Sequence, residues 1–383
     1  MKAVLLVPRL PGTGFTGDRL RAEIHLLALN DAGFETTVIG GTAPGEEPRV
    51  PLAACVRAVP LAPSRLPFAL ARAFVSGDPL QSALFSGAFR AALKQAGRMD
   101  LVVALLLPRL LPHVVGALGE APLVVDFVDA LAEAARQAAR HDPAPWRRGY
   151  WAVEAPRLAR AEARAAAGAA GLLATTPFDA AHLPAGTRAV ANGVTLLPPG
   201  PAERAPAVAF TGRLMYRPNR LAARRLLREI WPRVRRAVPD ARLLLGGADA
   251  PDEIRASHGR EGIEVVSPVP DMAAFLRRAR IVVAPVDLGT GTPNKLFEAF
   301  EAGAAVVASP GVIARAASSG APPPARSAVM DEEFAREIAG YLTDPVRAAR
   351  DGAAGRAFAE AHADRRVVVA ALVAAYRAAR EKP

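Results

Sequence analysis

Two charged residues stand directly after a glycine-containing loop in the second half of the chain. Lys295 and Glu298 are three residues apart, so on a helix they share one face. The loop before them follows an apolar, β-branched run at 281–284 that is typical of a buried strand. Lysine occurs only at positions 2, 94, 295 and 382, against a strong preference for arginine. A helix start with a lysine in its first turn favours a phosphate or another anion.

The ends of this helix are predicted from residues that commonly cap helices. Thr292 is expected as the N-cap, Pro293 at the first helical position and Gly303 as the C-terminal stop. Gly289 and Gly291 keep the preceding loop free of side-chain bulk.

A second predicted strand also ends in a glycine turn with a basic residue. The strand at 207–210 is followed by Gly212 and Arg213, and Asn219 can cap the next helix. Alone, this segment fits a surface arginine and an ordinary cap equally well. Together with Lys295 it favours a diphosphate site, where two cations neutralise the charge of a leaving phosphate.

Gly12, Gly14 and Gly17 match the G-x-G-x-x-G spacing of dinucleotide-binding turns. The context differs, because residues 8–11 separate the first strand from Gly12 and no acidic residue follows the second strand at 36–39. We therefore favour a flexible loop that approaches a phosphate through its backbone over a nicotinamide or flavin site. A plain loop is the remaining interpretation.

Candidate catalytic groups in the first half are few. Asp126 and Asp129 end a buried strand, and one of them could face a ligand, with a helix cap or a surface turn as the alternative. His113 has no acidic partner at an informative spacing, which favours a structural role. No pair of His, Asp or Glu residues has ligand spacing, so the sequence does not support a metal site.

The aromatic residues Trp146, Tyr150 and Trp151 are expected to fill a core or an interdomain seam rather than bind a sugar. Cys55 is the only cysteine, which excludes an internal disulfide and cysteine-based metal clusters. A cytoplasmic location is the default expectation for such a chain.

Composition permits two domains and argues against a membrane span. The chain has 383 residues, 51% of them hydrophobic, and its longest apolar run, residues 101–107, has the length of a strand. The net charge of +11 could attract nucleic acid, an anionic membrane surface or phosphorylated substrates. Few aromatic residues and no recognisable motif speak against nucleic acid. Contact with a membrane is suggested by the charge and by a basic final helix ending at Arg380.

Strands and helices alternate along the chain, which predicts an α/β protein with parallel sheets. The expected organisation is an N-terminal Rossmann-like domain at 1–197 and a C-terminal Rossmann-like domain at 198–362. A helix at 363–383 could pack back on the first domain. In two such sheets, ligands bind beyond the carboxyl ends of the strands, and both sets of ends could face one central cleft.

The second half resembles the nucleotide-binding domain of GT-B glycosyltransferases, in particular glycosyltransferase family 4. The segments that carry the resemblance are 210–219, 239–247, 266–271 and 294–303, in the family's order and spacing. In the first half, 125–129 and 192–194 resemble the subgroup associated with exopolysaccharide synthesis, so the resemblance is nearly full length.

This resemblance implies retaining, metal-independent sugar transfer from a nucleotide sugar, which is a donor substrate and not a cofactor. Glu298 would hold the donor's ribose, and Lys295 with Arg213 the diphosphate. The loop of Gly12, Gly14 and Gly17 would close over the phosphates. The turn at Gly212 and the loop residues Thr290, Gly291 and Asn294 would complete the donor site.

Two departures from the family pattern concern the donor. Thr290 stands where many members carry a second glutamate, and Pro218 and Asn219 occupy the region of a family lysine. We interpret these as subgroup features. The acceptor would be lipid-linked or a growing polysaccharide, used by a cytoplasmic enzyme peripheral to the inner membrane face. A non-catalytic scaffold of a polysaccharide-assembly complex and a sugar-nucleotide epimerase are the alternatives.

Overall fold

The computed structural model describes residues 1–11, 17–43, 50–61, 66–198, 204–287, 291–317 and 321–382. Gly12, Gly14, Gly289 and Thr290 lie outside the described residues. The chain forms two compact units, Met1–Gly193 with Arg366–Pro383, and Val194–Arg365. Each unit is described here on its own.

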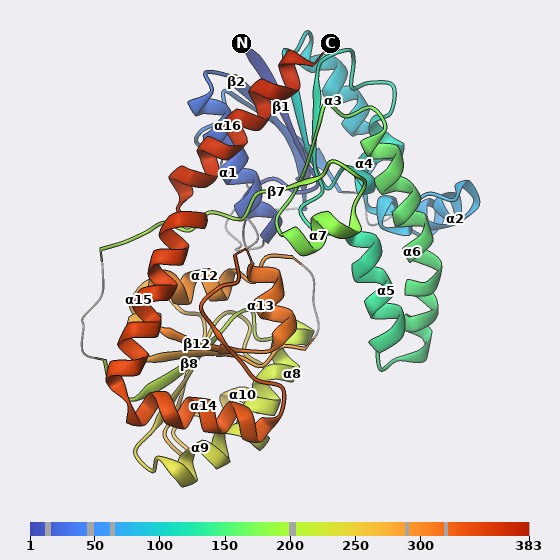
Figure 1. Ribbon diagram of the computed structural model, residues 1–383. Helices are drawn as coiled ribbons and strands as arrows, with labels where there is room; N and C mark the ends of the chain where they lie inside the picture. Colours follow the sequence, from blue (N-terminus) through green and yellow to red (C-terminus); the bar gives the residue numbers. More distant parts are fainter. Residues whose placement is uncertain are drawn as a thin grey trace. The chain divides into compact units, whose positions relative to one another are not determined.

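The first unit is built on a parallel sheet of seven strands in the order β3-β2-β1-β4-β5-β6-β7 (Figure 1). The strands with apolar, buried sequences lie at its centre, and they bury side chains on both faces. The strands are β1 (Lys2–Val7), β2 (Glu35–Thr42), β3 (Cys55–Pro60), β4 (Leu101–Leu105), β5 (Leu123–Asp126), β6 (Gly171–Ala174) and β7 (Arg188–Ala189).

Helices cover this sheet, and the last helix of the chain is one of them. Leu372 and Tyr376 of this helix are fully buried in the core beside α1 and β1. The helices are α1 (Gly17–Asp31), α2 (Leu66–Ser76), the 3-10 helix η2 (Leu80–Leu84), α3 (Ala88–Ala96), α4 (Leu107–Val114), α5 (Leu131–His141), α6 (Pro145–Ala166), α7 (Pro177–His182) and α16 (Arg365–Glu381).

The second unit has a parallel sheet of six strands in the order β10-β9-β8-β11-β12-β13. Its central strands are short apolar runs that are buried along their whole length. The strands are β8 (Ala207–Thr211), β9 (Arg242–Gly246), β10 (Ile263–Val266), β11 (Ile281–Ala284), β12 (Ala305–Ala308) and β13 (Arg326–Ser327).

The helices of the second unit alternate with these strands. One long helix starts as α8, passes through a π-helical turn and continues as α9. The helices are α8 (Arg217–Arg225), η3 (Leu226–Ile230), α9 (Trp231–Ala237), α10 (Asp252–Arg255), α11 (Met272–Arg277), α12 (Asn294–Glu301), α13 (Pro310–Ala316), α14 (Asp331–Thr343) and α15 (Pro345–His362).

The predicted α/β class with two Rossmann-like parallel-sheet domains is confirmed. Some details differ from the prediction. The edge strand β3 escaped prediction because five of its six residues are not buried, so it lacks an apolar pattern. The units divide at 193/194 and 365/366, whereas the expected boundaries were 197/198 and 362/363. Val194 belongs to the second unit because it pairs with Asp364 and its N–H donates to Ala363 O at 2.7 Å. Among the described residues, no helix is long and apolar enough to cross a membrane.

Candidate functional site

The predicted phosphate-binding residues lie at the topological switch point of the second sheet. β8 is the first strand of its unit, and it lies between β9 and β11, so the chain leaves it in opposite directions on its two sides. Ligands of open parallel sheets bind beyond the carboxyl ends of two such strands. Gly212 and Arg213 follow β8, and Lys295 and Glu298 follow β11 after the loop.

The turn after β8 is compact because two glycines let the backbone fold closely on itself. Gly212 and Gly247 have φ values of 142° and 151°. A Cβ on Gly247 would lie 1.8 Å from the carbonyl oxygen of Gly212, and a Cβ on Gly212 would lie 2.7 Å from Nδ2 of Asn219. Both positions therefore require glycine.

Asn219 connects the two strand ends. Its Oδ1 accepts a hydrogen bond from Lys295 Nζ at 2.7 Å, and its Nδ2 donates to the carbonyl oxygen of Arg213 at 3.1 Å. Lys295 Nζ also lies 4.6 Å from the centre of the Phe210 ring, a cation–π contact. The structure thus places the lysine ammonium at the carboxyl end of β8. Asn219 is not the predicted helix cap, because α8 starts earlier, at Arg217 after the N-cap Tyr216.

The start of α12 is one residue later than predicted. The helix begins at Asn294 with Pro293 as its N-cap, because Leu296 N–H donates to the carbonyl oxygen of Pro293. Thr292 is therefore not the cap. Gly303 ends the helix as predicted, with a φ of 70° and its N–H bonded to the carbonyl oxygen of Phe300.

The pKa values of Lys295 and Glu298 both move towards neutrality. Burial lowers the pKa of Lys295 to about 8, Glu298 opposes this shift and Arg315 adds to it. Burial also raises the pKa of Glu298, against the effect of Lys295. At neutral pH the lysine still carries its proton. No hydrogen bond joins the Glu298 carboxylate to another residue that the structure describes, so its oxygens can accept hydrogen bonds from a ligand.

The other predicted donor-site residues differ in their surroundings. Arg213 is paired with an acidic residue. Its side chain is 62% exposed, and its Nε donates to Asp249 at 2.7 Å. Gly291 is the first described residue after position 287. It is buried and has a φ of 76°. Asn294 is the first residue of α12, and Gly17 is exposed at the start of α1.

In the first unit, Asp126 has a structural role and does not line an open site. It is fully buried and accepts hydrogen bonds from Arg21 Nε at 2.8 Å, from Val128 N–H at 2.8 Å and from His25 Nε2 at 2.6 Å. His25 Nδ1 lies 2.6 Å from the hydroxyl oxygen of Tyr376 on α16. This network ties α1, β5 and α16 together.

Of the two predicted aspartates, Asp129 is the one whose pKa is raised. Burial, and then the negative charge of Asp179, raise its pKa to about 7, while Arg109 acts in the opposite direction. Arg109 follows β4 and its Nε is buried without a hydrogen-bond partner among the described residues. The sequence interpretation missed Arg109, and the only available signal was its place three residues after the strand-like run at 101–106.

Two strained residues mark the same edge of the first sheet. Leu106 after β4 and Val128 after β5 have φ values of 49° and 62°, and this conformation is costly for a β-branched residue such as Val128. Arg109 and Asp129 lie one to three residues beyond these two positions. Strain of this kind often accompanies a functional site.

The remaining predictions concern His113, the aromatic residues and a metal site. His113 is buried and its Nε2 lies 2.9 Å from the carbonyl oxygen of Ser82, which fits a structural role. Trp146 was expected in a core or seam, but its 71% exposure contradicts this. Tyr150 and Trp151 are half-buried and pack edge to face. Within the described ranges, no group of three His, Cys, Asp or Glu residues could hold a metal ion.

Comparisons with known proteins concern the fold and the second unit. Residues 205–344 match the family model described as "Glycosyl transferases group 1". Sucrose-phosphate synthase from Thermosynechococcus elongatus has a similar fold, with a TM-score of 0.68 and 17% identity over 98% of each chain. No curated protein sequence matches the chain.

Two further solved structures have the same fold. HepE from Anabaena, in complex with UDP and glucose, gives a TM-score of 0.67 at 14% identity over 97% of this chain and 98% of that one. Trehalose 6-phosphate synthase from Burkholderia multivorans gives 0.64 at 14% identity over 98% of each chain. The chain therefore has the GT-B fold of these glycosyltransferases, and residues 205–344 of its second unit match the group 1 glycosyl transferase model.

Proposed function

We propose that this GT-B chain is a retaining, metal-independent glycosyltransferase that moves a sugar from a nucleotide sugar to a lipid-linked or polysaccharide acceptor. The observation that carries the proposal is the position of the Lys295 ammonium. It lies at the switch point of a group 1 glycosyl transferase domain, joined through Asn219 to the turn after β8.

The donor's diphosphate would take the place of Asn219 as the main partner of Lys295. Lys295 lies in the first turn of α12, where the helix dipole favours negative charge. Gly212 has no side chain, so a phosphate can approach the backbone of the turn. Arg213 would leave Asp249, an exposed pair that costs little to break, and contact the diphosphate.

Glu298 would accept hydrogen bonds from the donor's ribose hydroxyls. It lies one helical turn after Lys295, and no described residue occupies its carboxylate. As the bond between sugar and phosphate breaks, negative charge grows on the leaving diphosphate. Lys295 stabilises that charge more strongly than it stabilises the intact donor, which lowers the barrier to transfer.

The first unit would hold the acceptor. Arg109 and Asp129, at the strained carboxyl ends of β4 and β5, offer a cation and a carboxyl group with a pKa of about 7. A carboxyl group near neutrality can exchange a proton with an acceptor hydroxyl. The loop of Gly12, Gly14 and Gly17 is proposed to contact the donor phosphates.

The test is donor turnover by Lys295→Ala and Glu298→Ala, measured as release of free nucleoside diphosphate. UDP-glucose is the first donor to try, since HepE has also been solved in complex with it. We expect Lys295→Ala to lower kcat/KM by about 100-fold to 1,000-fold, the cost of removing one charge-stabilising group. Lys94→Ala, on the exposed face of α3, is the matched control and should behave as wild type.

Calorimetry of nucleotide-sugar binding distinguishes the alternatives. Wild-type binding without release of diphosphate would indicate the scaffold if the donor stays unchanged, and the epimerase if its sugar is converted. Unchanged turnover in both variants, with unchanged melting temperatures, would overturn the assignment of the site.

A further inference from the structure

Helix α2 is apolar on nearly all sides, yet half of it faces solvent. Its sequence from Leu66 to Ser76 contains one charged residue, Arg72, and only Ala73 is fully buried. Phe68, Phe74 and Val75 are 79%, 59% and 88% exposed. An all-apolar helix normally lies inside a protein, and an exposed apolar patch of this kind marks a surface that another body covers.

The end of α2 is firmly attached to α6, so this apolar face is held in place. The buried guanidinium of Arg157 on α6 donates to the carbonyl oxygens of Ala73 at 2.9 Å and Phe74 at 3.2 Å. It also lies 4.8 Å from the ring of Phe74. Arg164 of α6 pairs with Asp78 just after α2. α2 is therefore fixed against α6.

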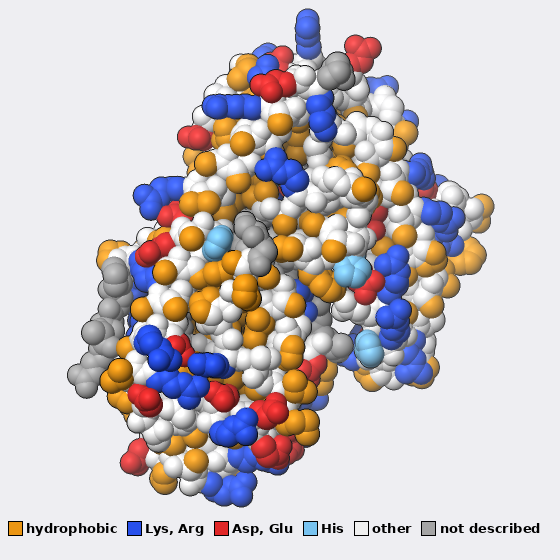
Figure 2. Space-filling model, viewed as in Figure 1, with side chains coloured by type: hydrophobic (Ala, Val, Ile, Leu, Met, Phe, Trp, Pro, Cys, Tyr) orange, Lys and Arg blue, Asp and Glu red, His pale blue; other side chains and the backbone are white. Residues whose placement is uncertain are grey.

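The neighbouring hairpin of α5 and α6 is basic. Within Leu131–Ala166, which the structure describes completely, three of the four carboxylates are buried, and Glu133 is paired with Arg136. The exposed charged side chains are all arginines: Arg140, Arg147, Arg148, Arg160 and Arg164. Figure 2 shows hydrophobic side chains gathered over α2 at the right of the view, and Lys or Arg side chains along the adjacent helices.

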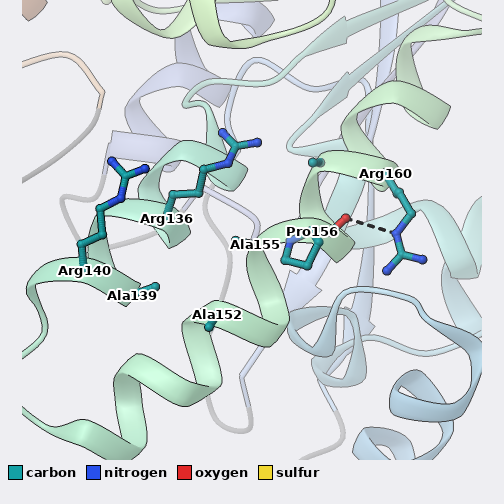
Figure 3. A pocket seen from close by; sticks show the side chains of 8 residues that line it. Arg136, Ala139, Arg140, Ala152, Ala155, Pro156 and Arg160 are labelled. Carbon is teal, nitrogen blue, oxygen red and sulfur yellow. Dashed lines mark hydrogen bonds between the residues drawn. The ribbon is translucent and has the colours of Figure 1, made fainter.

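A shallow groove of about 550 Å³ lies between α5 and α6 (Figure 3). Small apolar side chains form its floor and three arginines line it. The lining residues are Arg136, Ala139, Arg140, Ala152, Ala155, Pro156, Ala159 and Arg160. Arginines beside a small apolar floor suit a phosphate headgroup and the start of its acyl chains.

Trp146 stands at the N-terminal end of α6 with its ring 71% exposed and the Arg147 guanidinium 5.1 Å from the ring centre. Tryptophan is enriched where membrane meets water, because its ring is apolar and its N–H can stay hydrated. Aromatic side chains beside arginines are the composition of interfacial membrane-binding helices.

We propose that α2 and the α5–α6 hairpin form a docking surface for a bilayer that contains anionic phospholipid. Phe68, Val75 and Trp146 enter the boundary between headgroups and acyl chains, and the exposed arginines contact the phosphates. A nucleic acid would match the arginines, but it would leave Phe68 and Val75 in water. The final helix cannot supply this surface, because the apolar face of α16 is buried in the core.

Vesicle sedimentation with the full chain tests the surface without any donor or acceptor. Wild-type protein should pellet with phosphatidylcholine vesicles that contain about 30% phosphatidylglycerol, and not with phosphatidylcholine alone. The double variant Phe68→Ser, Val75→Ser should bind about tenfold more weakly, since binding scales with inserted apolar area. Each of Arg147→Gln and Arg148→Gln should cost about fivefold.

Matched controls come from the second unit. Val346 is 78% exposed, nearly as much as Val75, so Val346→Ser should leave pelleting unchanged. Arg228→Gln with Arg236→Gln, two exposed arginines, should change it far less than Arg147→Gln with Arg148→Gln. All replaced side chains are exposed, and melting temperatures confirm that the variants fold.

Tryptophan emission gives a second measurement. Anionic vesicles should shift the wild-type emission to shorter wavelength, and Trp146→Phe should remove most of the shift, because Trp231 is buried and Trp151 is half-buried. Equal pelleting with both vesicle types would overturn the proposal. So would arginine-dependent pelleting that the Phe68→Ser, Val75→Ser variant retains in full, which would indicate a polyanion site. A concentration-dependent dimer lost in that variant would assign the patch to a second copy of the chain. None of these outcomes bears on donor turnover, so this inference and the proposed function fail independently.

Discussion

Both units place a charged cluster at the carboxyl end of a central strand, and the two clusters differ in how completely their charges are matched. In the first unit, the Asp126 carboxylate has Arg21, His25 and the N–H of Val128 as partners. In the second unit, Lys295 has one hydrogen bond to another described residue, Asn219. Both clusters lie where open parallel sheets bind ligands.

The matched cluster is locked in its charged state. Although burial acts to raise the pKa of Asp126, Arg21 and His25 hold it well below its usual range. Burial lowers the pKa of His25, which is therefore neutral, and its Nδ1 can accept the hydrogen bond from Tyr376. The Asp126 carboxylate is therefore held by three partners inside the protein.

The open cluster is different, because burial is not compensated. The pKa values of Lys295 and Glu298 shift towards neutrality, since each charge lacks partners that would replace its water. The comparison indicates that charges satisfied inside the protein define the fold, whereas incompletely satisfied charges define a binding site. Three experiments can test this distinction.

The largest effect is expected for Asp126→Asn. It leaves Arg21 buried without its counter-charge, so the free energy of unfolding of the first unit should fall by about 3–5 kcal/mol. The thermal transition of that unit reports the loss. Asp249→Asn, which breaks the exposed pair with Arg213, is the control and should cost less than about 1 kcal/mol. Equal effects would mean that burial does not separate the two kinds of pair.

A gain in stability is expected for Asp129→Asn. The pKa of Asp129 is raised from 3.8 to about 7 in the folded state, so the wild type loses stability as the pH rises through this range. The variant escapes that loss, and its melting temperature should exceed that of the wild type by about 10 °C more at pH 8 than at pH 4. Acceptor transfer should fall at the same time, as expected for a strained functional site.

Exposed Asp240 supplies the control for this experiment. Asp240→Asn should show no such dependence on pH. A lower melting temperature of Asp129→Asn at pH 8 would place Asp129 among the structural charges of the Asp126 type.

The smallest effect is a change in pH profile for Lys295→Arg. Lys295 has a pKa of about 8, so its charge is lost as the pH rises above this value. The kcat/KM of the wild type should fall about tenfold per pH unit there, since this ratio reports the free enzyme. Arginine stays charged, so the variant should lack this fall, although its activity at pH 7 is lower because its geometry differs.

Identical profiles for Lys295→Arg and wild type would remove Lys295 as the titrating group. Lys94→Arg, on an exposed helix face, should reproduce the wild-type profile.

The sequence predicted those parts of the fold and site that depend on neighbouring residues. The alternation of apolar strands with helices was sufficient for the two parallel sheets. The spacing of Lys295 and Glu298 was sufficient to place them on one helix face. Asn219 was assigned the wrong role because its partner Lys295 lies 76 residues away, and no local pattern reports such a contact.

The same reasoning explains the first unit. Arg109 and Asp129 come near each other only because β4 and β5 are neighbours in the sheet. Trp146 was expected to be buried because it is large and apolar, a rule that fails at a surface built for an outside partner. Phe68 lies in a segment whose secondary structure the sequence did not define.

The docking of α16 on the first unit has a consequence for synthesis. A ribosome delivers residues 194–365 before it delivers 366–383, so the middle unit can fold while the unit begun first still lacks Leu372 and Tyr376. A chain that lacks residues 366–383 has a cavity in its first unit, where Leu372 and Tyr376 would pack, and cellular proteases can recognise such a defect.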